Sequence, residues 1–167
     1  MLNLCKKPVI VVSRCLGFGV CRWNGAALAC RLVDELKEAV NFIPVCPECE
    51  IGLGMPRPPI RLVQKNSVLA LMQPETGLDL TAAMVGFTEK FLQSLVQVDG
   101  FLLKRKSPSC GLADIPIYAA PDAEVPLNKK GTGFFARSVD RYFPDIPKVD
   151  EECPGKESFL ELLKLLK

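Results

Sequence analysis

The 167-residue chain has the length of one domain and is long enough to bury a hydrophobic core. Hydrophobic residues make up 49% of it and charged residues 24%, which excludes a disordered chain. A net charge of +2 is too small to indicate a nucleic-acid-binding protein by itself. The absence of histidine removes the commonest general base, the histidine-assisted nucleophiles and imidazole metal ligands.

Hydrophobic periodicity predicts that strands and helices alternate along the chain. The expected strands are at 8–13, 41–47, 100–104 and 146–149, with a hairpin over 60–73 that turns at Lys65–Asn66. The expected helices are at 25–40, from 79–81 onward, within 131–143 and at 158–167. This order predicts an α/β fold, in the form of a single Rossmann-like three-layer domain with a mainly parallel sheet.

No apolar run approaches the ~18 residues that a membrane span needs, and the first residues lack a small-residue cleavage site. We therefore expect a cytoplasmic protein without a membrane partner. Eight cysteines in such a chain are not expected to form a disulfide framework. Metal ligation, catalysis and simple burial are the better interpretations, and thiolates favour zinc, copper(I) or iron–sulfur clusters.

Three cysteines follow three of the predicted strands. Cys15 comes two residues after the first strand, Cys46 lies at the end of the second, and Cys110 follows the strand at 100–104 across a turn. In an open parallel sheet, ligands bind at the carboxyl ends of the strands, near the point where the strand order reverses. The sequence therefore predicts that these three thiols meet at one edge of the sheet, and that the site lies there.

The segment VCPECEIGLGMPRPP (45–59) contains a Cys-x-x-Cys spacing, which occurs in zinc sites, redox dithiols and iron–sulfur proteins. A structural zinc site usually needs two close pairs of ligands, and the chain has no second pair. A thioredoxin-like dithiol begins a helix, whereas Pro47 and the Gly- and Pro-rich residues after it predict a loop. We therefore interpret Cys46 as one ligand of a three-point site. Arg57, in the same segment, is expected to face RNA or solvent.

A three-thiolate site suits a [4Fe-4S] cluster, because four thiolates would leave no Lewis-acidic iron open to substrate. The alternative is an α/β domain with inert buried thiols. Cys5, Cys30 and Cys153 are predicted to be buried or incidental. Cys21 and Cys49 border the proposed site and are candidates for a fourth ligand or for a group behind the ligands.

Two further segments are candidates for ligand contact. Trp23 could stack on a base, and Asn24 could pair with a pyrimidine edge; equally, Asn24 could form a turn before the first helix. The N–H groups at Gly131 and Gly133 could hold an anion at a helix start, although G-x-G alone is a weak motif.

The segments SRCLGFGVCRWNG, VCPECEIGLGMPRPPIRLV and KRKSPSCG, in this order, resemble the three signature blocks of the thiouracil desulfidase family. QPETGLDLTAAMVGFTEKFL and GTGFFAR also resemble its longer branch, in which this domain is the N-terminal catalytic part of a tRNA 4-thiouridine desulfidase. The resemblance covers a core at 8–150, with a C-terminal helix expected in 151–167, and we expect residues 1–167 to form one domain. The C-terminal domain of the longer branch has no counterpart here.

The resemblance implies a Rossmann-like domain that holds a [4Fe-4S] cluster through Cys15, Cys46 and Cys110, with one iron open. Such a protein would remove sulfur from a small thiolated pyrimidine, such as 4-thiouracil, or from 4-thiouridine in tRNA. It would release sulfide and the oxo base without a net redox change. Cys49 departs from the family pattern, since an aliphatic residue is expected beside this block.

The same blocks imply Glu48 and Ser107 as the catalytic pair and Ser109 as a substrate-binding residue. A carboxylate is the natural proton-transfer group in a chain without histidine, and the serine could relay a proton or hold water. The alternatives are a solvent-facing loop acid and a turn serine. The basic runs Lys104–Lys106 and Lys129–Lys130 would be solvated or, with a tRNA substrate, would contact phosphates. A non-catalytic iron–sulfur sensing module and a structural zinc protein are the competing functions.

Overall fold

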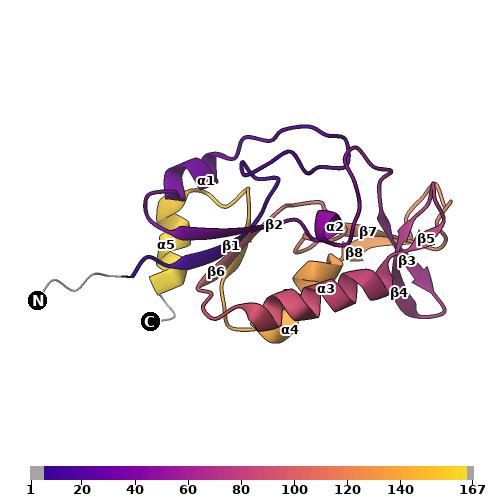
Figure 1. Ribbon diagram of the computed structural model, residues 1–167. Coiled ribbons are helices and arrows are strands. Elements are labelled where there is room, and N and C mark those ends of the chain that lie inside the picture. Colours follow the sequence, from indigo (N-terminus) through magenta and orange to yellow (C-terminus); the bar gives the residue numbers. More distant parts are fainter. Residues whose placement is uncertain (1–5, 165–167) are drawn as a thin grey trace, which may run out of the picture.

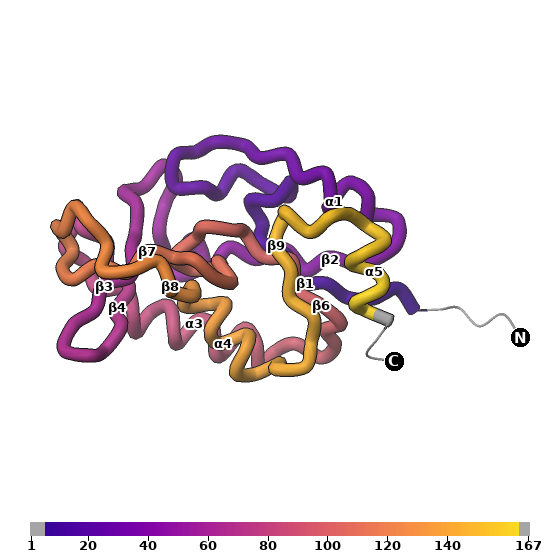
Figure 2. Tube along the Cα trace, turned by 180° about the vertical axis from the view of Figure 1, so that it is seen from behind, coloured from indigo at the N-terminus to yellow at the C-terminus, as the bar shows by residue number. Residues whose placement is uncertain are grey.

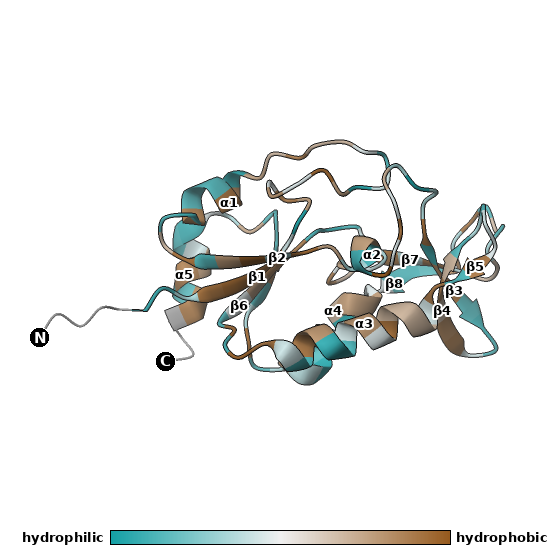
Figure 3. Cartoon of the chain, viewed as in Figure 1, coloured by the Kyte–Doolittle hydropathy of each residue, from teal (hydrophilic) through white to brown (hydrophobic). Residues whose placement is uncertain are grey.

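The first of two β-sheets is fully parallel and has the strand order β2-β1-β6-β9 (Figure 1). The computed structural model describes residues 6–164. The strands of this sheet are β1 (Val9–Ser13), β2 (Asn41–Val45), β6 (Gly100–Leu103) and β9 (Lys148–Asp150). The prediction of an α/β fold with a mainly parallel sheet is confirmed. Figure 3 shows β1 and β2 as hydrophobic along most of their length, and β1, an inner strand, is almost entirely buried.

The second sheet is mainly antiparallel and has the order β5-β4-β3-β7-β8. Its strands are β3 (Arg61–Lys65), β4 (Val68–Gln73), β5 (Leu78–Asp79), β7 (Ile115–Tyr118) and β8 (Asn128–Gly131). The predicted hairpin is confirmed as β3 and β4, and Asn66 and Ser67 form its turn with φ angles of 46° and 67°. The sequence analysis missed β7 and β8, because IPIY contains a proline and NKKG is polar.

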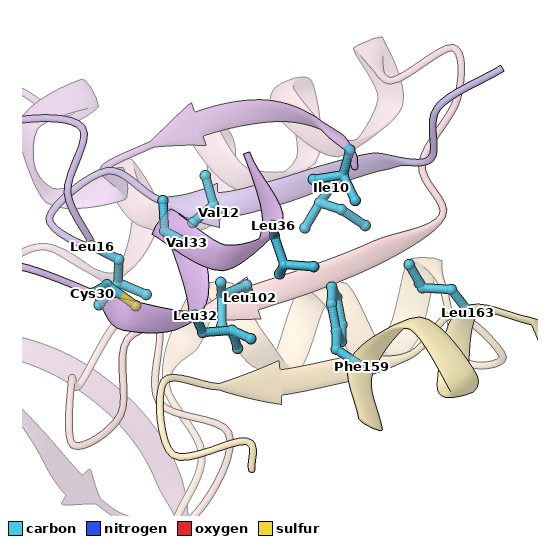
Figure 4. Packing of buried hydrophobic residues seen from close by; sticks show 11 residues of the cluster. Ile10, Val12, Leu16, Cys30, Leu32, Val33, Leu36, Leu102, Phe159 and Leu163 are labelled. Atoms are coloured by element: carbon cyan, nitrogen blue, oxygen red, sulfur yellow. The ribbon is translucent and has the colours of Figure 1, made fainter. Parts of the chain in front are cut away.

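Helices cover both faces of the first sheet. The helices are α1 (Arg31–Leu36), α2 (Pro47–Glu50), α3 (Thr81–Ser94), α4 (Phe134–Tyr142) and α5 (Lys156–Lys164). On one face, Ile10 and Val12 of β1 pack against α1 and α5, where Phe159 is fully buried (Figure 4). On the other face, Val11 packs against α3 and α4. This alternation along β1 produces the predicted three layers.

Helix α3 connects the two sheets. Its C-terminal half packs under the first sheet through Leu92, and its N-terminal half packs under the second through Met84. In the view from behind, α3 and α4 lie along the lower side of the molecule and run from the second sheet toward the first (Figure 2). In the described part of the chain, no helix is both long enough and apolar enough to cross a bilayer.

The helix predicted over 25–40 is wrong in extent, because α1 is helical only from Arg31 to Leu36. The residues before it form a loop that runs from the first sheet toward the second and back (Figure 1). The carbonyl of Trp23 accepts the Arg57 N–H at 2.8 Å, so tertiary contacts override the helix propensity of the alanines here. Residues 165–167 of the last predicted helix, and Cys5, lie outside the described residues.

The start of α4 holds the loop that follows β6. The first three N–H groups of α4 donate to the carbonyl oxygens of Pro108 and Ser109 at 2.9–3.2 Å, and the Gly133 N–H donates to Gly111 at 2.8 Å. The prediction of an anion site at this helix start is therefore wrong, since carbonyl groups already occupy its donors. Gly131, the other glycine of that motif, ends β8.

We predict that Gly133→Ala destabilises the protein. A Cβ at this position would lie 2.3 Å from the Ser109 carbonyl oxygen and 2.9 Å from the Cys110 nitrogen, so helix and loop would have to separate. We expect a loss of about 1–3 kcal/mol in the free energy of unfolding, measured by chemical denaturation. Gly86→Ala, in α3, is the control, because nothing lies within 4 Å and alanine is favoured in helices. Equal stability of the two variants would contradict the close contact.

Candidate active site

A cavity of about 420 Å³ opens at the carboxyl ends of β1, β2 and β6. Hydrogen bonds connect these three strand ends: the Arg14 N–H donates to the Val45 carbonyl, and the Lys104 N–H donates to Ser13 Oγ, both at 2.8 Å. The loop before β3, which carries Arg57, provides a further wall. The cavity lies at the edge of the sheet where the sequence analysis expects the site.

The thiols of Cys15, Cys46 and Cys110 all line this cavity, one from the loop after each strand. All three are free; Cys46 and Cys110 are buried and Cys15 is half-buried. Cys21 also lines the cavity. In residues 6–164, no three Cys, Asp or Glu side chains converge closely enough to hold a single metal ion.

The remaining cysteines lie elsewhere. Cys30 is buried in the apolar cluster between the first sheet and α1, and Cys153 packs against that cluster, which agrees with their predicted burial. Cys49 is not among the residues that line the cavity; its thiol is 3.9 Å from the Cys21 carbonyl. Of the two candidates for a fourth ligand, Cys21 thus lines the cavity, whereas Cys49 lies outside its lining.

The cavity strongly favours the protonated form of its thiols. Burial, together with the neighbouring Cys110, raises the pKa of Cys15 to about 12. Burial likewise raises the pKa of Cys110 to about 12 and moves the pKa of Cys46 in the same direction. Thiolates at these positions would therefore require a positively charged partner, which is the chemistry of cysteines that bind metals or iron–sulfur clusters. The donor set fits such a group.

The Cys-x-x-Cys segment forms one turn of helix, α2, rather than the predicted loop. Cys46 is extended, with φ −124° and ψ 97°, and Pro47 takes the first helical position, where no N–H donor is needed. The Glu50 N–H donates to the Cys46 carbonyl at 3.0 Å and closes the turn. Helix formation here places Glu48 in the wall of the cavity, which Cys46 also lines.

Glu48 and two serines form a hydrogen-bonded row along the cavity wall. Ser109 Oγ donates to Glu48 Oε1 at 2.6 Å, and Ser107 Oγ lies 3.0 Å from Ser109 Oγ. Ser107 Oγ also accepts the Cys110 N–H at 3.1 Å, so this serine stabilises a turn as well as facing the cavity. The structure brings together the two predicted catalytic residues through Ser109.

Arg57 is the residue of this site that the sequence analysis did not identify. Its guanidinium donates from Nε and Nη2 to Glu48 Oε2, at 2.9 Å and 2.7 Å, and Arg57 is only 8% exposed. The interpretation that it faces RNA or solvent is therefore wrong. The signal that could have identified such a residue is that a largely buried glutamate needs a counter-charge. The sequence does not show which arginine provides it. Arg61 instead donates to backbone carbonyls and stacks on Tyr118.

Trp23 and Asn24, the two neighbouring residues predicted to contact a ligand, lie in different places. Trp23 lines the cavity and is 48% exposed, so one part of its ring remains accessible at the mouth. Asn24 is exposed and is not among the lining residues; its side-chain oxygen accepts the Ala26 N–H at 3.1 Å. Asn24 thus forms the turn that was the alternative to substrate binding.

The basic run after β6 is largely neutralised. Lys104 forms an ion pair with Glu151, and Arg105 pairs with Glu152 and lies 3.9 Å from Asp150. Lys106 lines the cavity with these two residues. The second basic run, at 129–130, lies in β8 and is not part of the cavity lining.

Comparisons with known proteins give consistent results. A family model described as 2-thiouracil desulfurase matches residues 10–151, which include the three thiols, Glu48 and both serines. The uncharacterized protein YbbK of Bacillus subtilis (strain 168) is 31% identical over 110 residues, which cover 62% of this chain and 73% of that protein. A solved structure described as the [4Fe-4S]-dependent thiouracil desulfidase TudS superimposes with a TM-score of 0.64 at 26% identity, over 96% of this chain and 98% of that chain.

Proposed function

The chain belongs to the 2-thiouracil desulfurase family, and on this premise we propose that it is a desulfidase acting on thiolated pyrimidines such as 4-thiouracil. Water replaces the sulfur of the thiocarbonyl group, which gives the oxo base and hydrogen sulfide, with no change of oxidation state. The observation that carries the proposal is that three free thiols and the hydrogen-bonded carboxylate of Glu48 face one cavity.

The residues that would hold a [4Fe-4S] cluster are Cys15, Cys46 and Cys110. They follow three different strands and line one cavity. When bound through three thiolates, such a cluster supplies one iron as a Lewis acid for the soft thiocarbonyl sulfur. The similar solved structure is described as [4Fe-4S]-dependent, which supports this assignment.

Glu48 is the proposed general base. Its Oε1 is the oxygen that faces Ser109 and, beyond it, Ser107, whereas Oε2 is held by Arg57. Glu48 takes a proton from the water that attacks the ring carbon, and the two serines carry a proton along the cavity wall toward the leaving sulfur. Trp23, at the mouth, provides a face on which the pyrimidine can stack.

The ion pairs at the rim favour a small thiolated pyrimidine over thiolated tRNA. Binding of tRNA depends on cations that are free to meet phosphates. Lys104 and Arg105 already neutralise acidic residues of the segment after β9. Of the basic run, this leaves Lys106 to meet a phosphate.

We predict that anaerobic reconstitution with iron and sulfide gives a broad absorbance band at about 400 nm and about four irons per chain. Cys15→Ala, Cys46→Ala and Cys110→Ala should each lose the band. Cys30→Ala and Cys153→Ala are matched controls, because these cysteines pack outside the cavity, and should retain it. Binding of zinc in place of iron would overturn the cluster and favour a structural zinc protein.

We predict that Glu48→Gln lowers kcat for thiouracil by about 100-fold or more, because general base catalysis typically contributes that much. The absorbance band should remain, since Glu48 is not a proposed ligand. Glu50→Gln is the control: it lies in the same helical turn but is not among the lining residues. Full turnover in Glu48→Gln would contradict the proposed role. A wild-type protein that holds the cluster but does not turn over would favour the sensing module.

We predict that kcat/KM for free thiouracil changes little between about 50 and 200 mM salt, because the substrate is neutral. Thiolated tRNA should be a poorer substrate under the same conditions. A higher kcat/KM for thiolated tRNA, falling steeply over this range as phosphate contacts are screened, would contradict the small-molecule assignment.

A further inference from the structure

Arg57 is a buried cation whose presence in the cavity wall calls for a physical reason. Its side chain is 5% exposed and that of its partner Glu48 is 13% exposed. Taking both charges out of water is unfavourable, and a buried ion pair rarely stabilises a fold more than an apolar pair of the same size. Fold stability alone is therefore a weak explanation for this pair.

All three nitrogens of the Arg57 guanidinium are used, and in different directions. Nε and Nη2 both donate to a single oxygen, Glu48 Oε2, at 2.9 Å and 2.7 Å. Nη2 also donates to the Cys21 carbonyl at 2.9 Å, and Nη1 donates to the Gly54 carbonyl at 3.0 Å. The guanidinium is thus held by two backbone carbonyls while it holds one carboxylate oxygen.

This arrangement makes the two carboxylate oxygens of Glu48 different. Oε2 receives two N–H donors from a group that is itself anchored, so the carboxylate cannot rotate without breaking both bonds. Within residues 6–164, Oε1 receives a single donor, the Ser109 hydroxyl at 2.6 Å, on the side of the two serines. One oxygen is fixed, and the other is presented toward Ser109 and Ser107.

We propose that Arg57 is a positioning residue that fixes the Glu48 carboxylate through Oε2 and so presents Oε1 to the serines and the attacking water. This inference rests on the proposed desulfidase activity, in which Glu48 is the base. Arginine is required because its planar fork supplies two donors to the same oxygen in a fixed geometry, whereas lysine is a flexible point charge. A displacement of a reacting group by about 1 Å is enough to slow catalysis by about 100-fold.

The first test compares Arg57→Lys with Arg61→Lys, a nearby arginine that donates to Pro121 and Ala123 and is not among the lining residues. Arg57→Lys should lower kcat for thiouracil by about 100-fold with a much smaller change in KM, because the base is misplaced rather than the substrate. Iron content and the absorbance band should stay at wild-type values. Arg61→Lys should retain the wild-type kcat.

Chemical rescue separates positioning from general structural damage. In Arg57→Ala, guanidinium ions added below unfolding concentrations should restore part of kcat by occupying the vacated position, and sodium or ammonium ions should not. A wild-type kcat in Arg57→Lys would overturn the proposal. A loss of kcat that follows loss of iron from the protein, with no guanidinium rescue, would also overturn it.

The contact between Arg57 and Glu48 is also tested by a measurement that does not depend on enzyme activity. Failure of this contact can then be told apart from failure of the desulfidase assignment. In protein that has not been reconstituted, Glu48→Gln, Arg57→Gln and the double variant are compared by thermal unfolding. The double variant should lower the unfolding midpoint by less than the sum of the single variants, because each single variant leaves the partner charge buried and unpaired. Additive shifts would show that Arg57 does not hold Glu48, whatever the substrate of the wild-type protein.

Discussion

Parallel strands that end at one edge of a sheet bring residues together that are far apart in the chain, and this site depends on that constraint. Cys15, Cys46 and Cys110 are separated by more than thirty positions each, but each follows a strand of the same parallel sheet. The Arg14–Val45 and Lys104–Ser13 hydrogen bonds then fix the three loops to one another. Because β1 and β6 are buried and pair with each other, and β2 pairs with β1, the loops have little freedom to move apart.

The same edge of the sheet also holds a largely buried charge, the Glu48 carboxylate, which is compensated by an ion pair with Arg57. A carboxylate among three desolvated thiols would be unfavourable alone, since burial already raises the pKa of Cys15 and Cys110. Arg57 compensates the charge of Glu48 at 2.7 Å and is fixed by the carbonyl of Gly54 in its own loop and by the carbonyl of Cys21 in the loop after β1. The cavity wall therefore keeps the proposed base paired with a cation and largely away from bulk water.

The sequence was most informative where one segment determines its own structure. The apolar β-branched run at 8–13, the hairpin turn near Asn66 and the helix from Thr81 all form as predicted. It was least informative where distant contacts decide the outcome. Alanines before α1 are not helical because this loop contacts the Arg57 segment, and NKKG is a strand only because it pairs with β7.

The candidate site divides in the same way. The convergence of the thiols could be predicted because each follows a strand of a parallel sheet, and Glu48 could be named because VCPE resembles a family block. The role of Arg57 could not, since nothing local distinguishes a buried arginine from one that faces solvent. The basic run after β6 is a further case: β9 lies beside β6 in parallel register, with Leu103 opposite Asp150, so the acidic residues after β9 meet Lys104 and Arg105.

Arg57 also links the loop after β1 to Glu48, the proposed base. Its Nη2 donates both to Glu48 and to the carbonyl of Cys21, so the loop that follows Cys15 is held by the group that holds the carboxylate. Cys21 lines the cavity beside the three proposed ligands, and its backbone is anchored on the side of Arg57. A cluster with one open iron needs its three thiolates, its base and its neighbouring loop at fixed mutual distances. The Arg57 guanidinium contacts both Glu48 and the loop that carries Cys21. A shift of Glu48 or of this loop would therefore break hydrogen bonds to Arg57.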